Sequence, residues 1–117
     1  MDQQECLRAG IDYNDGVARF VGNAGIYEKF LKEFLSDQSF AALETALDGG
    51  DLSASFQAAH TLKGLTGNLS LNVLYGHLVT LTDALRGAGN LPLAQSLFPT
   101  VREDYRRAVD FIRANVK

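Results

Sequence analysis

Apolar residues recur at intervals of three and four along most of this chain, which is the spacing of one face of an α-helix. No run alternates apolar and polar residues as a strand would, and only two prolines interrupt the pattern. We therefore predict an all-α protein. The pattern is clearest at Ile26, Tyr27, Phe30, Leu31 and Phe34, at Leu74, Leu78, Leu81 and Leu85, and at Val101, Tyr105, Ala108, Val109 and Ile112.

Capping residues and glycines divide this pattern into segments. Four major segments with short connections predict an antiparallel four-helix bundle with short extra N-terminal helices, in one domain over residues 1–117. Pro99 should kink or split the last helix, since proline removes a helical hydrogen bond. The two short N-terminal helices are predicted at 3–9 and at 14–20, the second capped by Asn14. The major helices are predicted at 23–48 with a kink at 36–37, from the cap Asp51 to a turn at 68–72, at 72–86, and from about 91 onward.

Composition narrows the classes of function. The net charge is −3 and no basic run occurs, so we expect no nucleic acid partner. Residues 64–82 lack charged side chains but are too polar for a lipid-facing helix, so we expect no membrane insertion. Cys6 is the only cysteine, and the N-terminus lacks the pattern of a secretory signal. These features predict a cytoplasmic protein, which we expect to be a monomer.

The segment around His60 carries the candidate chemistry. Residues 52, 56, 59, 62, 66 and 69 form the predicted core face of this helix, and His60 lies at the border of that face, close in angle to Gln57. Lys63 follows one turn later and brings a flexible cation next to the imidazole. A histidine near an apolar face is more often a packed or solvated residue than a reactive one.

Gly64 and Gly67 are the unusual feature of this segment. A glycine inside a helix costs roughly 1 kcal/mol relative to alanine, so two of them near one histidine need a reason. We interpret them as clearing the surface beside His60, so that a partner can approach the imidazole. A bare imidazole with an adjacent cation on a flat surface is a plausible acceptor of an anionic group.

At these residues the chain resembles the histidine-containing phosphotransfer (HPt) domains of multistep phosphorelays. Their motif is approximately Ala-His-x-Leu-Lys-Gly, followed by small residues and Asn-Leu-Gly; here it stands as Ala59-His60-Thr61-Leu62-Lys63-Gly64 and Gly67-Asn68-Leu69. The chain departs from the pattern at Ser70, where the family often has glycine, and at Thr82, where many members carry Gln or Glu facing the histidine.

The resemblance implies that His60 accepts a phosphoryl group from a receiver-domain aspartate and passes it to another receiver. Lys63 would stabilise the phosphoryl oxygens, Gly64, Gly67 and Gln57 would serve access and docking, and Thr82 could hydrogen-bond the imidazole. The implied partners are response-regulator receiver domains and a sensor or hybrid histidine kinase. The chain itself would need no cofactor, because Mg²⁺ would be bound by the receiver, and it would be a carrier rather than an enzyme with its own turnover.

Two alternatives remain open from the sequence. The chain could be the phosphoacceptor domain of a chemotaxis-type kinase, phosphorylated directly by an ATP-binding domain. It could also be a non-catalytic helical interaction module in which His60 only contacts a partner. His77 has no neighbouring cysteine, and only scattered carboxylates accompany it, so we predict no metal site. Glu103 and Asp104 are expected to lie on a solvated face of the last helix.

Overall fold

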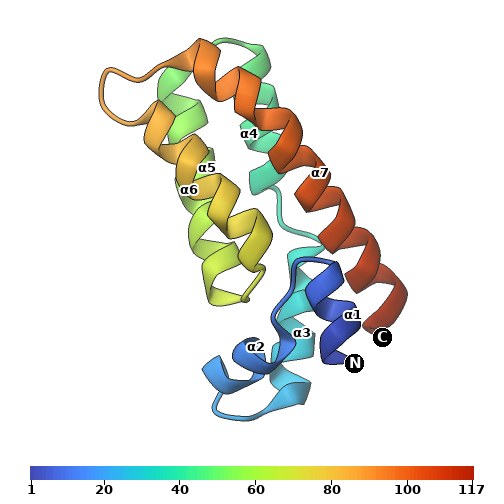
Figure 1. Ribbon diagram of the computed structural model, residues 1–117. Helices are drawn as coiled ribbons and strands as arrows, with labels where there is room; N and C mark the ends of the chain where they lie inside the picture. The colour runs from blue at the N-terminus through green and yellow to red at the C-terminus, as the bar shows by residue number, and fades with distance from the viewer.

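A computed structural model describes all residues from 1 to 117 and contains seven helices and no strand (Figure 1). The all-α prediction is confirmed. No helix is both long and apolar enough to cross a membrane. The helices are α1 (Gln3–Arg8), α2 (Tyr13–Arg19), α3 (Ala24–Phe34), α4 (Ser39–Asp48), α5 (Leu52–Asn68), α6 (Asn72–Leu85) and α7 (Leu91–Asn115).

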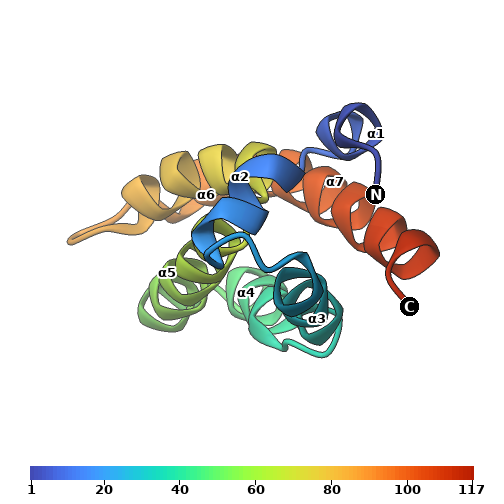
Figure 2. The ribbon, with the colours of Figure 1, turned by 90° about the horizontal axis from the view of Figure 1, so that it is seen from below.

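Helices α4, α5, α6 and α7 form the bundle. Each packs against the next one along the chain, and contacts between α4 and α7 close the ring. Helix α7 runs along the whole molecule, with α4 beside its first half and α3 beside its second half (Figure 1). The short helices α1 and α2 lie with α3 at one end, and the view along the molecule shows α2 close to α5 and α6 (Figure 2). The bundle with short N-terminal helices is therefore present.

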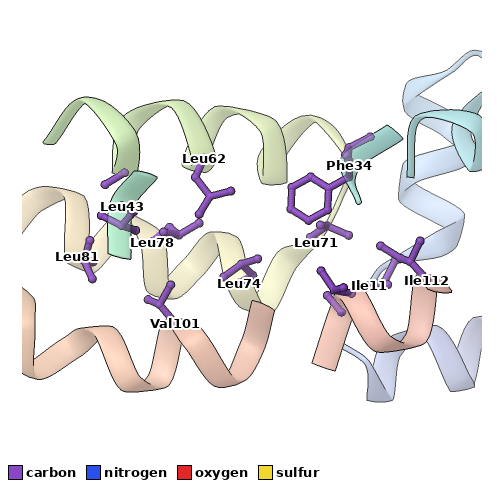
Figure 3. Packing of buried hydrophobic residues seen from close by; sticks show 14 of the residues in the cluster. Ile11, Phe34, Leu43, Leu62, Leu71, Leu74, Leu78, Leu81, Val101 and Ile112 are labelled. Carbon is purple, nitrogen blue, oxygen red and sulfur yellow. The ribbon is translucent and has the colours of Figure 1, made fainter. Parts of the chain in front are cut away.

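One continuous hydrophobic core joins the bundle to this end. It contains 22 buried residues, from Cys6 in α1 to Ile112 in α7. Leucines of α4, α5 and α6 point toward Val101 of α7 in the middle, while Phe34, Leu71, Ile11 and Ile112 meet where the short helices pack (Figure 3). The periodic apolar positions of the sequence thus fill one interior, and their burial orients each helix about its axis.

Tyr27 fastens the N-terminal helices to the bundle. Its ring is fully buried, and its hydroxyl donates a 2.6 Å hydrogen bond to the carbonyl of Leu69, just after α5. The backbone of α2 lies directly on this ring, since a Cβ built at Gly16 would be only 2.1 Å from the Tyr27 Cζ atom. Glycine is therefore required at position 16, and the contact fixes where α2 lies relative to the end of α5.

Most of the predicted helix boundaries agree with the structure, but two details were wrong. The segment 23–48 is two helices rather than one kinked helix, and Asp37 accepts a hydrogen bond from the Ser39 amide where α4 begins. The cap of α2 is Asp12 instead of Asn14, since its carboxylate accepts from the Asp15 amide. Helix α7 passes through Pro99 without being split.

The expectation that Asp104 is solvated was also wrong. This carboxylate is only 6% exposed and pairs with Nδ1 of His77 on the neighbouring helix α6. Arg107 lies 4.0 Å away on its own helix. A buried carboxylate needs such partners, because an isolated charge is costly away from water. His77 therefore has a structural partner between α6 and α7.

We predict that Tyr27→Phe lowers the free energy of unfolding by about 1–2 kcal/mol, because the Leu69 carbonyl loses its buried donor. Tyr75→Phe is the matched control, since the Tyr75 side chain is 38% exposed and removes no such bond. Chemical denaturation of both variants measures the difference. Equal losses would show that the Tyr27 hydroxyl does not stabilise this junction.

Candidate functional site

Helix α5 has one buried face and one open face. Ser55, Ala59, Leu62 and Thr66 are buried, at the spacing of successive helical turns. His60 lies outside this face and is exposed, as is Gly64 one turn later. Packing of the buried face against α4 and α6 therefore turns the imidazole toward solvent.

The imidazole of His60 is supported by an aromatic neighbour on its own helix. The ring of Phe56 stacks beside it, with centroids 5.9 Å apart and planes inclined by 20°. The guanidinium carbon of Arg86, at the end of α6, lies 5.6 Å from the centroid of the same Phe56 ring. This cation–π contact helps to hold Phe56 in place, so the orientation of His60 depends on α6 as well as on α5.

Lys63 lines a polar hollow of about 340 Å³ beyond His60. It belongs to none of the ion pairs in the structure. Arg19 of α2 lines the same hollow, together with the carboxamides of Asn68 and Asn72, and no carboxylate does. Arg19 is paired with Asp15 and Lys63 is unpaired, so this hollow carries an excess of positive charge although the chain as a whole carries a net charge of −3.

The two glycines of α5 have different surroundings. A Cβ built at Gly64 has no neighbouring heavy atom within 4 Å, whereas one at Gly67 would lie 3.0 Å from Cε1 and 3.1 Å from Cδ1 of Tyr75. Gly64 therefore leaves open surface beside His60. Gly67 lines the polar hollow as well, but its missing side chain also lets the Tyr75 ring of α6 pack against α5.

Gln57 and Thr82 do not line the polar hollow that Lys63 lines. Gln57 is exposed and lines a separate shallow hollow toward the start of α4. Thr82 is fully buried, and its hydroxyl oxygen has no hydrogen-bond partner. The expected hydrogen bond from Thr82 to His60 is therefore not formed, because this short side chain is enclosed while the imidazole faces solvent.

An apolar hollow of about 480 Å³ adjoins the polar one. Asn68 lines both, and Phe20, Phe30 and Leu65 are among the apolar residues of the larger hollow. Phe30 is 41% exposed and stacks on Phe20 with ring centroids 5.3 Å apart. Exposed aromatic rings beside a hollow are typical of surfaces that bind another protein.

The departure at Ser70 has a structural explanation. Its φ angle is +56°, a left-handed conformation that glycine adopts most easily. The Ser70 hydroxyl donates a 2.6 Å hydrogen bond to Oδ2 of Asp15, and its carbonyl accepts from the Asp12 amide at 2.9 Å. These bonds attach α2 to the turn between α5 and α6 and offset the cost of the left-handed conformation.

Asp15 in turn positions Arg19. The Arg19 Nε atom donates to Oδ2 of Asp15 at 2.9 Å. The bonds from Ser70 and then from Arg19 hold the pKa of the Asp15 carboxyl below its ordinary value. A lowered pKa means that this carboxylate contributes to stability above its unfolded pKa, and that the contribution is lost as the pH falls through the folded value.

Sequence reasoning missed Phe56 beside His60, Arg86 against the Phe56 ring, and Arg19 in the polar hollow. Phe56 was assigned to the core face, and neither Arg86 nor Arg19 was singled out. Arg86 and Arg19 come from other helices, so only the fold brings them close. A signal existed for Phe56 alone, since its spacing of four residues from His60 allows the two rings to meet.

No group of His, Cys, Asp and Glu side chains in the chain could hold a metal ion. The hollow beside His60 instead offers cations and carboxamides, which suit an anion.

The contrast between the two glycines predicts different responses to the same substitution. Gly64→Ala should raise the free energy of unfolding by up to ~1 kcal/mol, because alanine favours helix and its Cβ has open space. Gly67→Ala should gain less or destabilise, since Tyr75 must move. Thermal or chemical unfolding of both variants provides the measurement.

The control for this comparison is Gly67→Ala in a Tyr75→Ala background. Without the ring, the alanine at position 67 should recover the gain seen at position 64. If Gly67→Ala already stabilises the native chain as much as Gly64→Ala does, the packing role of Gly67 is refuted.

Comparison with known proteins identifies the family. The family model of the Hpt domain matches residues 26–111, which include most of α3 and the whole of α4, α5 and α6. No curated protein and no solved structure matches the chain significantly. The matched region contains His60, Lys63 and Gly64 with the geometry described above. The chain belongs to the Hpt domain family and is a histidine phosphotransfer domain of two-component signalling.

Proposed function

We propose that His60 is the phosphoacceptor of this domain, and that it receives a phosphoryl group from a receiver-domain phosphoaspartate and passes it to a second receiver. The observation that carries this proposal is the exposed imidazole with open surface at Gly64 and the unpaired cation of Lys63 one turn away. In this proposal the chain acts as a carrier that passes the group on, as its membership of the Hpt family implies.

The transfer step follows from this geometry. An unprotonated ring nitrogen of His60 attacks phosphorus, a nitrogen–phosphorus bond forms, and the bond from phosphorus to the aspartyl oxygen breaks, which returns the receiver carboxylate. Such transfers depend mainly on in-line positioning and on neutralising charge at the phosphoryl oxygens. The Phe56 ring orients the imidazole, and Lys63 supplies the positive charge. The receiver contributes Mg²⁺ together with the carboxylates that hold it.

The surface around His60 has the composition of a docking site. A cationic part lies next to the imidazole, and the apolar hollow with Phe20 and Phe30 lies farther along α5. An acidic receiver would be attracted by the first part and held by burial of the second. We place this exchange in the cytoplasm and assign it to a monomer, whose exposed aromatic surface is left free for the partner.

The phosphoacceptor assignment predicts that His60→Gln abolishes labelling. Incubation with purified receiver domains, phosphorylated on aspartate with acetyl phosphate, should label the native chain with an acid-labile phosphoryl group. His77→Asn is the matched control, because its amide nitrogen can replace Nδ1 of His77 as the partner of Asp104. It should keep both the fold and the labelling.

Other outcomes of this experiment distinguish the alternatives. Persistent labelling of the His60→Gln variant would contradict the assignment. Labelling of the native chain only by an ATP-binding kinase domain, and by no receiver, would indicate a phosphoacceptor domain of a chemotaxis-type kinase. No labelling by either donor would leave a helical interaction module.

Open surface at position 64 should matter for transfer rather than for stability. Gly64→Gln is expected to fold at least as stably as the native chain, because its Cβ meets no other atom. It should nevertheless slow transfer by at least about tenfold, since in-line attack tolerates little displacement of the reacting atoms. Thermal unfolding and the rate of transfer are measured on the same sample.

Gly76→Gln is the control for this prediction. Gly76 is also exposed inside a helix, and a Cβ there also meets no atom within 4 Å, but it lies on α6. Its variant should transfer at nearly the native rate. A stable Gly64→Gln variant with unchanged transfer would refute the access role of this glycine.

A further inference from the structure

The polar hollow beyond His60 contains a second cation, Arg19, which the proposed phosphotransfer step does not use. Arg19 reaches the hollow from α2, while Lys63, Asn68 and Asn72 line it from α5 and α6. Arg19 lies outside residues 26–111, which the Hpt family model matches, so the family match assigns it no role. Its place in the hollow therefore needs its own explanation.

The position of Arg19 is fixed by a chain of contacts. Ser70 donates to Asp15, and Asp15 accepts from Nε of Arg19 through the same carboxylate oxygen. The contact between Gly16 and the Tyr27 ring fixes the backbone of α2 in addition. The guanidinium is thus held at its Nε atom, while its two terminal amino groups form no other ion pair.

The free part of this guanidinium is suited to a carboxylate. The Arg19 side chain is 51% exposed, and its terminal amino groups form a planar pair of donors. The hollow has room for a side chain, and no acidic residue lines it. An Arg–carboxylate pair is directional as well as strong, so such a contact would define the angle at which a partner lies on α5.

We propose that this hollow binds an acidic side chain on the surface of the docking receiver domain, with Arg19 as the residue that anchors it. The inference rests on the proposed function, because the occupant is assigned by continuity with the surface at His60 and by charge complementarity to a receiver. Lys63 then serves the phosphoryl group, and Arg19 serves the docked protein. Replacing Lys63 should therefore affect the phosphoryl group, and replacing Arg19 should affect docking of the receiver.

The test uses Arg19→Gln and the receiver that labels the native chain fastest. The receiver concentration that gives half-maximal transfer should rise on the order of 10-fold, which corresponds to the loss of one charge-assisted contact. The transfer rate at saturating receiver and the lifetime of the phosphohistidine should stay at their native values. Added salt should weaken docking less in the variant than in the native chain.

Arg113→Gln is the matched control. It removes the same charge from another exposed ion pair, between Arg113 and Asp110, and the C-terminal end of α7 lies away from α5 in Figures 1 and 2. It should leave the half-maximal concentration unchanged. An equal effect of both substitutions would indicate general attraction of an acidic partner and would overturn the assignment of the hollow.

Asn72→Asp provides a second variant that leaves Arg19 in place. Asn72 begins α6, where an acidic side chain is favourable, so the fold should be retained. The added carboxylate would compete with that of the receiver and should also raise the half-maximal concentration. This result is expected even if Arg19→Gln disturbs α2.

Each remaining outcome has a definite meaning. A native half-maximal concentration in both hollow variants would refute the carboxylate site while leaving the role of His60 intact. A shortened phosphohistidine lifetime in Arg19→Gln would show that Arg19 contacts the phosphoryl group instead. Failure of the native chain to accept phosphoryl from any receiver would refute the proposed function itself.

Discussion

The burial of one face of α5 fixes the rotation of this helix, and the properties of the His60 surface depend on that rotation. Ala59, Leu62 and Thr66 are buried between α4 and α6, so the residue after Ala59 necessarily lies toward solvent. A rotation of about 100° would bury His60 in place of Ala59. Packing of this face thus keeps the imidazole exposed, and the orientation of the proposed phosphoacceptor is set by buried residues of its own helix.

The glycines of α5 show how one sequence signal can have two physical causes. Both lie inside helix α5 and both follow His60 closely, so the sequence suggests one explanation for the pair. Gly64 has open space, in agreement with that explanation, whereas Gly67 lets the Tyr75 ring approach. The sequence could not separate them, because the position of Tyr75 depends on how α6 packs against α5.

Features that depend on packing between helices could not be predicted from the sequence, whereas local features could. Periodicity and local caps act within a few residues, and the caps Asn23 and Asp51 located the starts of α3 and α5 correctly. The pair between His77 and Asp104 joins two helices, so it left no trace in the local pattern. Likewise, Arg19 and Lys63 are far apart in the sequence and share a hollow only because α2 is attached to the turn after α5.

Ser70 connects these observations. Glycine would adopt its left-handed conformation with less strain, but glycine has no hydroxyl to donate to Asp15. Serine therefore makes the turn less favourable than glycine would, but it adds the hydrogen bond that attaches α2. Helix α2 contains Arg19, which lines the polar hollow, and Phe20 directly after α2 lines the apolar hollow. Ser70, which departs from the family pattern, is thus the residue that attaches α2 to the turn between α5 and α6. The attachment places Arg19 and Phe20 on the surface along α5, while the buried face of α5 separately keeps His60 exposed.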